Sequence, residues 1–177
     1  MSEIYAIKER SDDKKLEVFF DYTCPYCYRG HKNLQELMKK YQNLDIIWRP
    51  CEAHPRPEEH GVHSDQAICG MYFVLEHDGD LLKYHKLVFE AVFEHNLDIS
   101  DIAVLADIAE KCAVPKKAFE EALQKGIYQK LVTRGNVYAW SEKDFDAVPS
   151  YARGKKKIGS GNGVMVTKDE LEKFINA

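Results

Sequence analysis

The chain has 177 residues, enough for one compact domain, or one domain with an insertion, built around a real core. Hydrophobic residues make up 45% and charged residues 31% of the sequence, a balance typical of a globular, soluble protein. The formal net charge of -4 gives no electrostatic reason to expect a nucleic-acid partner. No apolar run is long enough to span a membrane, so no membrane partner is expected.

The N-terminus and the cysteine count both bear on the compartment. Residues 1–15 have no apolar core for a secretory signal, because charged side chains recur throughout them. These are Glu3, Lys8, Glu9, Arg10, Asp12, Asp13, Lys14 and Lys15. The 5 cysteines are an odd number at irregular spacing, unlike the disulfide framework of a secreted domain. The sequence therefore predicts a cytoplasmic protein, in which a Cys-x-x-Cys motif is catalytic or metal-binding.

A buried strand is predicted to run directly into a helix at a pair of cysteines. Residues 16–22 are mainly apolar and aromatic, and helical spacing of apolar residues begins after Cys27. Pro25 suits the first helical turn, because its missing N–H would have no partner there. Cys24 is therefore expected at the helix N-terminus. There the N–H groups of Tyr26 and Cys27 and the helix dipole would stabilise a thiolate and lower its pKa.

Two thiols in this arrangement are suited to disulfide exchange. The exposed Cys24 would attack a disulfide, and Cys27, one turn further along and less exposed, would resolve the mixed disulfide. The alternative is half of a structural zinc site. Such sites usually carry a second close pair of ligands, which the sequence does not offer near either cysteine.

The remaining elements are predicted as follows. Residues 44–49 form a second strand, which would lie parallel to the first as a strand–helix–strand unit. Residues 53–63 read as a loop rich in proline and histidine, and residues 64–143 as a bundle of helices. Ser100 is expected to cap one of these helices, and Pro115 to open another.

Strand character returns near the C-terminus. Residues 147–152 and 158–160 read as strands joined by a turn at Gly154 and the lysines 155–157, and residues 161–163 as a kink or bulge. Thr167 and Glu170 form a capping box that opens the last helix. The fold class predicted is α/β. A β-α-β half and a β-β-α half share a mixed sheet, with residues 1–62 and 145–177 forming one discontinuous domain around a helical insertion at 63–144.

A proline inside the third strand requires an explanation, because it cannot donate to a sheet ladder. The Val148–Pro149 bond is expected to be cis and to face the cysteines at the sheet edge, where no donor is needed. The main chain of Val148 would then be available to pair with an extended substrate.

The chain resembles the DsbA-like thioredoxin-fold oxidoreductases over nearly its full length. The resemblance rests on Cys24-Pro25-Tyr26-Cys27, Trp48-Arg49-Pro50 and Val148-Pro149-Ser150-Tyr151, together with the all-helical insertion. The segment Glu94-His95-Asn96-Leu97-Asp98-Ile99-Ser100 is similar to the cytoplasmic FrnE-like subgroup. Two features depart from the family pattern. Cys51 stands where a bulky apolar residue is usual, and Phe145-Asp146-Ala147 replaces a glycine-containing segment before the proline loop.

The resemblance implies a thioredoxin fold and a dithiol–disulfide oxidoreductase. Cys24 would be the nucleophile, Cys27 the resolving thiol and Pro149 the cis proline of the site. No cofactor is implied beyond the redox-active Cys24–Cys27 pair, and no metal. The partners would be protein or low-molecular-weight thiols and disulfides; the sequence leaves a homodimer open, and also the direction of the reaction.

Several residues have both a functional and a structural interpretation. Pro25, Tyr26 and Tyr151 would line the substrate groove, although the tyrosines could equally well only pack. His31 lies on the same helical face as Cys27 and either tunes the thiolate or is a partly packed surface residue. Asp21 either accepts a proton beside Cys27 or ends the strand.

The other thiols and histidines have simpler readings. Cys51, Cys69 and Cys112 are most simply small buried residues. The histidines of the 53–63 loop, His54, His60 and His63, could join Cys51 in a metal site, but a polar loop also exposes histidines without any function.

Two other classes of function stay in view. A glutathione-dependent transferase or isomerase of the kappa class shares this architecture, but such enzymes typically have serine where Cys24 stands. The third class is a non-enzymatic ligand- or metal-binding module that uses the cleft between sheet and helices. Stoichiometric zinc in the purified protein would favour that module.

Overall fold

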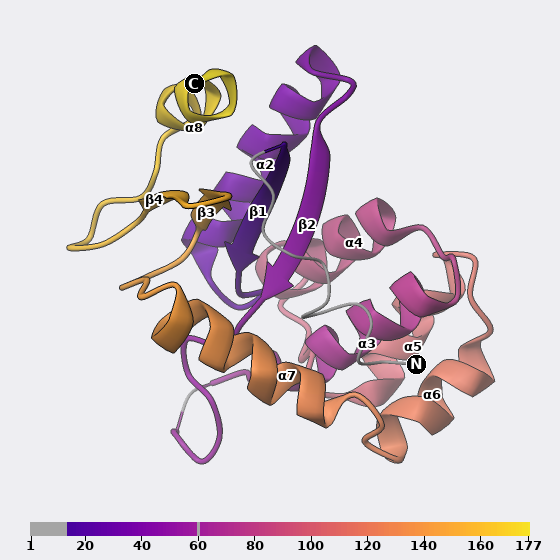
Figure 1. Cartoon of the computed structure of the whole chain (residues 1–177). Helices are drawn as coiled ribbons and strands as arrows, with labels where there is room; N and C mark the ends of the chain where they lie inside the picture. The colour runs from indigo at the N-terminus through magenta and orange to yellow at the C-terminus, as the bar shows by residue number, and fades with distance from the viewer. Residues whose placement is uncertain (1–13, 60) are drawn as a thin grey trace.

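The computed structural model describes residues 14–59 and 61–177 (Figure 1). His60 and most of the charged N-terminal residues discussed above lie outside these ranges. Four strands form one sheet in the order β2-β1-β3-β4. Their bounds are β1 Lys15–Phe20, β2 Asp45–Pro50, β3 Ser150–Arg153 and β4 Lys156–Gly159. Strand β1 pairs parallel with β2 and antiparallel with β3, which confirms the predicted mixed sheet drawn from both ends of the chain.

Helices make up most of the rest of the described chain. Their bounds are α2 Pro25–Lys40, α3 Asp65–Glu76, α4 Leu81–Phe93, α5 Ile102–Glu110, α6 Lys116–Gln124, α7 Gln129–Asn136 and α8 Lys168–Asn176. A π-helical segment, η1 Val137–Glu142, continues α7. Figure 1 shows α3 to α6 gathered at one end of the sheet and α8 at the other, near the C-terminus. None of the helices in the described ranges is both long and apolar enough to cross a membrane.

Two local predictions were wrong, one about a helix cap and one about the extent of a turn. Asp101, not Ser100, caps α5: its carboxylate accepts from the Ala103 N–H at 2.9 Å, while the Ser100 hydroxyl donates to Asp98. Lys156 and Lys157 belong to strand β4 rather than to the turn. Gly154, with φ +57°, and the residue after it make the whole turn, because Arg153 already pairs with Lys156.

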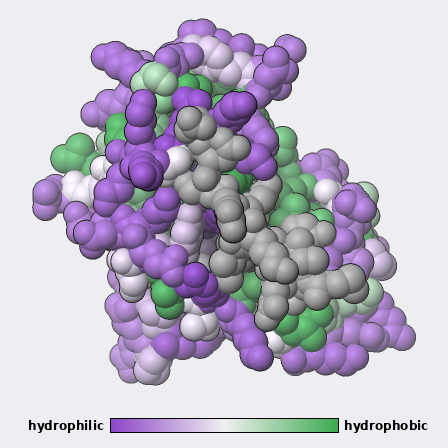
Figure 2. Space-filling view, in the orientation of Figure 1, coloured by the Kyte–Doolittle hydropathy of each residue, from purple (hydrophilic) through white to green (hydrophobic). Residues whose placement is uncertain are grey.

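The two faces of β1 pack against different helices, as the alternation of side chains in a strand requires. On one face, Phe20 lies against Phe89 of α4, with ring centroids 6.3 Å apart. On the other face, Phe19 lies 4.8 Å from Phe145 and 5.7 Å from Tyr138 of η1. One continuous hydrophobic core therefore includes residues of the sheet and of the helices on both sides. On the face drawn in Figure 2, hydrophilic residues predominate and hydrophobic ones appear as separate patches.

A buried carboxylate joins η1 to the sheet. Glu17 of β1 is fully buried and accepts from Arg49 Nε at 3.0 Å and from the Tyr138 hydroxyl at 2.5 Å. Lys143 Nζ lies 3.5 Å from the second carboxylate oxygen. Losing one partner of a buried ion pair is costly because the other charge stays uncompensated, so these contacts fix η1 against β1 and β2.

The close approach of α7 to the end of β2 depends on Gly135. A Cβ at this position would lie 2.7 Å from the backbone oxygen of Pro50. Neither the helix nor the strand end can yield by a side-chain rotation, because the clash is with the backbone. Gly135 is therefore required by packing, although alanine is the better helix former.

We expect Gly135→Ala to destabilise the protein by about 1–3 kcal/mol, the usual cost of overpacking, in spite of its higher helix propensity. Chemical denaturation monitored by circular dichroism measures this. Gly61→Ala is the matched control, because a Cβ there meets nothing within 4 Å. Equal stability of the two variants would show that α7 can move away from β2 freely.

Candidate active site

The connection between β1 and α2 is held by Asp21. This buried carboxylate accepts from the Thr23 N–H and hydroxyl, both at 2.9 Å, and from the Ala53 N–H at 2.8 Å. The Asp21 carbonyl accepts from the Cys24 N–H at 3.2 Å. Asp21 therefore ends the strand, which was one of its two predicted roles, and it also ties the start of α2 to the segment after β2.

Cys24 is the N-cap residue of α2 and Pro25 the first residue of the helix, as predicted. The Cys24 side chain is partly exposed, and its Sγ lies 3.7 Å from the carbonyl oxygen of Val148. Hydrogen bonding from the Cys27 thiol lowers the pKa of Cys24, and the backbone N–H groups of Cys27 and Tyr26 lower it further, against an opposing effect of burial. The predicted direction of this pKa shift is confirmed.

Cys27 has the opposite environment although it lies in the same helical turn. It is 2% exposed, and its Sγ accepts from the Asp21 N–H at 3.4 Å. Burial raises the pKa of the Cys27 thiol well above its ordinary value, and the hydrogen bond it donates to Cys24 adds to this. One sulfur of the pair is thus accessible and acidic, and the other is enclosed and protonated.

The loop before β3 brings Pro149 to the helix that carries the cysteines. The Val148–Pro149 bond is cis, as expected. A Cβ at Gly30 of α2 would lie 3.0 Å from Pro149 Cγ, so the helix and the proline are in close contact. The Ser160 hydroxyl donates to the Pro149 carbonyl at 2.5 Å and holds the loop from behind. Phe145, part of the departure from the family pattern, is buried against Phe19 and leaves this geometry intact.

The two tyrosines predicted to line a groove differ in exposure. Tyr26 is 44% exposed and Arg29 lies over its ring, with 5.7 Å between the guanidinium carbon and the ring centroid. Tyr151 is only 1% exposed and lines an internal cavity with Cys27 and Pro149. Only Tyr26 therefore offers a surface to a substrate, and Tyr151 packs behind the buried sulfur.

Two histidines complete the cavity behind Cys27. His31 of α2 and His85 of α4 both line it, and their ring centroids are 6.0 Å apart. His31 is 6% exposed, so its interpretation as a surface residue was wrong. Burial lowers the pKa of His31 to about 4, and it lowers the pKa of His85 well below the ordinary value. Both rings are therefore neutral at physiological pH.

His85 was missed as a candidate site residue by sequence reasoning. The signal available was a single histidine within the otherwise apolar stripe of α4, between Leu81 and Phe89. The stripe does not indicate that α4 packs against α2. The contact between His85 and His31 of α2 could therefore not be predicted from the sequence.

The three remaining cysteines are buried, as predicted. Cys51 lies directly after β2, and its Sγ is 3.7 Å from the Phe20 carbonyl oxygen. Burial raises the pKa of Cys51, Cys69 and Cys112, so none of them shares the acidity of Cys24.

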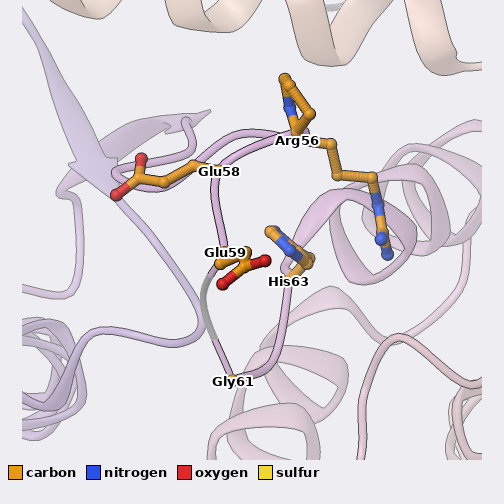
Figure 3. Close-up of a pocket in the computed structure, with 6 residues that line it drawn as sticks. Arg56, Glu58, Glu59, Gly61 and His63 are labelled. Carbon is orange, nitrogen blue, oxygen red and sulfur yellow. The ribbon is translucent and has the colours of Figure 1, made fainter.

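The histidine-rich loop forms a separate hollow at the surface (Figure 3). Arg56 and Glu58 extend to opposite sides of it, with His63 between them. His54 Nδ1 lies 2.8 Å from Glu58, and His63 Nδ1 lies 3.1 Å from the His54 carbonyl oxygen. Cys51 is buried at the end of the sheet and is not among the residues that line this hollow. Within residues 14–59 and 61–177, no group of three histidine, cysteine or acidic side chains could hold a metal ion.

A thioredoxin fold that presents an accessible, acidic thiol beside an enclosed one and a cis proline defines the class of thiol–disulfide oxidoreductases. The chain belongs to the family of DSBA-like thioredoxin domains, whose model matches residues 15–167. The recognition made from the motifs is confirmed at the level of this family, and with it the enzyme class, a DsbA-like dithiol–disulfide oxidoreductase.

Individual proteins are similar over most of the chain. The uncharacterized protein YwbO of Bacillus subtilis is 26% identical over 196 aligned positions, covering 91% of this chain and 95% of that protein. The structure of oxidised BdbD from Bacillus subtilis is similar with a TM-score of 0.73 and 16% identity, covering 92% of this chain and 85% of the other. DsbA from Chlamydia trachomatis gives a TM-score of 0.71 and 18% identity, with 92% and 84% covered. These structures confirm the fold.

The acidity of Cys24 leads to a direct test. We expect the rate of Cys24 alkylation by iodoacetamide to rise with pH through a midpoint below that of a free thiol, because the thiolate is stabilised by hydrogen bonds. Cys27→Ala should raise this midpoint, since it removes the thiol that donates to Cys24. Cys69→Ala is the control and should leave it unchanged. A wild-type midpoint at the free-thiol value would contradict an activated Cys24.

The buried histidines make stability depend on pH. In the unfolded chain His31 takes up a proton below its ordinary pKa of 6.5, whereas in the folded protein it stays neutral down to about 4. Stability should therefore be lost as the pH falls from about 6.5 to about 4, by on the order of 3 kcal/mol from His31 alone. Denaturation at several pH values measures this. His31→Leu should flatten the profile, while His95→Leu, at an exposed position, should not.

Proposed function

We propose that the chain catalyses thiol–disulfide exchange with Cys24 as nucleophile and Cys27 as resolving thiol. The observation that carries the proposal is the asymmetry of the pair: Cys24 is partly exposed with a lowered pKa, and Cys27 is buried with a raised one. Thiolate is the attacking species in exchange, so only Cys24 is ready to attack a substrate. The pair needs no cofactor beyond its own sulfurs.

The exchange runs in two steps. The Cys24 thiolate attacks one sulfur of a substrate disulfide, forms a Cys24–substrate disulfide and expels the other substrate sulfur as a thiolate. Cys27 then loses its proton and attacks the Cys24 sulfur, which forms the Cys24–Cys27 disulfide and releases the second substrate thiolate. The substrate gains two electrons and the protein loses two. The reverse sequence oxidises a substrate dithiol.

The proposed substrates are protein thiols and disulfides, on which DsbA-like oxidoreductases act, and low-molecular-weight disulfides. Tyr26 gives an exposed aromatic surface next to Cys24. The Val148 carbonyl lies 3.7 Å from the Cys24 sulfur and is positioned to pair with an extended chain. We assign Pro25, Tyr26 and Val148 to substrate binding. Tyr151, which was predicted with them, is buried and supports the proline loop from inside.

We further propose that the chain is a cytoplasmic member of the FrnE-like subgroup, with residues 63–144 as its helical insertion. The segment that carries this resemblance begins at Glu94, whose carboxylate accepts from the hydroxyl of Tyr28 on α2 at 2.7 Å. The first residue of this segment thus contacts α2, the helix that Cys24 caps. The serine typical of kappa-class transferases is absent, and Cys24 takes its place.

Single substitutions in the pair test the assignment. Cys24→Ser should abolish the reduction of insulin, because no attacking sulfur remains. Cys27→Ser should keep the attack and lose the resolution, so that mixed disulfides between Cys24 and substrate thiols accumulate and are detected by mass spectrometry.

Cys69→Ser and Cys112→Ser are the controls for this experiment. They should retain turnover and lose only packing energy, on the order of 1–3 kcal/mol. If both Cys24→Ser and Cys27→Ser were equally inert toward thiols and lost a bound metal instead, the pair would be a structural metal site. The reduction potential measured against glutathione then fixes the direction in which the exchange runs.

A further inference from the structure

The cavity behind Cys27 carries two histidine nitrogens to which the exchange reaction, as described so far, gives no role. His31 and His85 line this cavity together with the Cys27 side chain. Among residues 14–59 and 61–177, neither ring Nε2 has a hydrogen-bond partner, although both atoms are buried. Unpaired polar atoms are rare in protein interiors because each one costs free energy. Two of them at one cavity therefore indicate a small polar occupant.

The size of the cavity limits what that occupant can be. About 10 Å³ is open to the centre of a water-sized sphere, which is at the lower end of what one buried water molecule needs. The walls are otherwise mainly apolar, with Val18 and Phe20 from β1 among them, and no charged side chain of the described residues lines the space. One water molecule fits both the volume of the cavity and the two nitrogens.

Tyr22 sets which nitrogen of His85 carries its proton. The Tyr22 hydroxyl lies 2.8 Å from His85 Nδ1 and has no other partner in the described chain. Burial raises the pKa of Tyr22, so the phenol keeps its proton. We assign Tyr22 as the donor and Nδ1 as the acceptor, because Nδ1 is the acceptor in contact with this hydroxyl. His85 then carries its own proton on Nε2, which makes it a hydrogen-bond donor to the cavity. A water held by His85 is free to donate to the acceptor nitrogen of His31.

We propose that His31, through one water held between it and His85, relays to solvent the proton that Cys27 must lose when it resolves the mixed disulfide. This inference rests on the proposed exchange reaction. The S–H bond of Cys27 breaks as the Cys24–Cys27 disulfide forms and the Cys24–substrate disulfide breaks. The proton passes by way of the water to His31 Nε2 while His31 Nδ1 gives its own proton to solvent, so the ring stays neutral. The electron pair leaves with the substrate thiolate, which then takes a proton from solvent.

The placement of the groups favours His31 as the proton acceptor. Residues 27 and 31 are four apart on one helix, so their side chains lie on the same face. His31 keeps 6% of its surface exposed whereas His85 keeps none, so only His31 can exchange the proton with solvent. The other titratable groups that line the cavity are Tyr151 from β3 and His85, which is bonded to Tyr22, and burial keeps both phenols protonated.

Asp21 is the competing acceptor, since it lies at the end of β1 beside Cys27. Its carboxylate already accepts three hydrogen bonds, from the Thr23 N–H and hydroxyl and from the Ala53 N–H. These hydrogen bonds hold the β1–α2 connection and the segment after β2. A proton on the carboxylate would weaken the hydrogen bonds.

The test separates the two steps of exchange with one reagent. The reduced protein is mixed in a stopped-flow instrument with substoichiometric dithionitrobenzoate. A first thionitrobenzoate is released when Cys24 attacks, and a second when Cys27 resolves the adduct. Both absorbance phases are followed in a buffer without imidazole. The pH is varied from about 6 to about 9, so that the range covers about 1–2 units on either side of neutral pH.

The second phase should be slowed roughly 10²-fold at neutral pH in His31→Leu and in His31→Gln, while the first phase stays within about twofold of wild type. The deficit should shrink as the pH rises, since hydroxide then removes the proton, and added imidazole should restore part of the rate. His31→Gln keeps a polar group but cannot take up a proton, so it serves if the leucine variant does not fold. His95→Gln, at an exposed position, is the matched control.

Three results would overturn the inference. An unchanged second phase in both His31 variants, with two normal phases in wild type, would remove His31 from the reaction and leave the proposed function standing. An equal loss in both phases would mean that His31 acts on the structure of the site. A slow second phase in Asp21→Asn alone would assign the proton to Asp21. The absence of a second release from wild type would instead contradict the exchange function itself.

Discussion

The hydrogen bond from the Cys27 thiol to the Cys24 sulfur is the interaction on which the chemistry of this protein depends. It is the largest cause of the lowered pKa of Cys24, and it also helps to raise the pKa of Cys27. This hydrogen bond therefore helps to make Cys24 the nucleophile and Cys27 the resolving thiol, although the two side chains are chemically identical. Cys27 has to be protonated for the bond to exist, so the resolving step must begin by breaking it.

The balance between burial and hydrogen bonding decides the sign of each pKa shift. For Cys24, partial exposure leaves the desolvation cost smaller than the gain from the thiol and from two backbone N–H groups. For Cys27, burial is the largest cause, and the single N–H of Asp21 does not offset it. The backbone N–H groups of the helix N-terminus lower the pKa of Cys24, whereas the N–H group that acts on Cys27 is that of Asp21.

Local sequence signals were enough for the elements that define the site. The change from strand to helical spacing at the cysteines, Pro25 at the first helical position and Pro149 next to β3 all have local causes, and the structure has each as expected. The capping box at Thr167 is equally local and is present. Patterns of this kind depend on neighbours in the chain, which a single sequence displays.

Features that depend on packing between distant segments could not be predicted in this way. Of the two interpretations of His31, the surface one was wrong because helix α2 alone gives no sign that α4 covers this residue. The burial of His85 and its bond to Tyr22 join residues 63 positions apart. Ser100 and Asp101 are both good capping residues, and the choice between them depends on where the Ser100 hydroxyl donates. In each case the outcome depends on tertiary contacts, which a single sequence does not display.

The helical segment is therefore part of the site rather than an accessory to it. His85 and Phe89 of α4 form the wall behind Cys27 and pack on Phe20 of β1, within a core that runs without interruption from the sheet into the helices. The division into a discontinuous domain and an insertion at 63–144 stays a prediction about chain organisation. Energetically the two parts share one core, so a change in α4 reaches the buried thiol directly. A helical segment of this kind can adjust the resolving step without altering the Cys-Pro-Tyr-Cys motif itself.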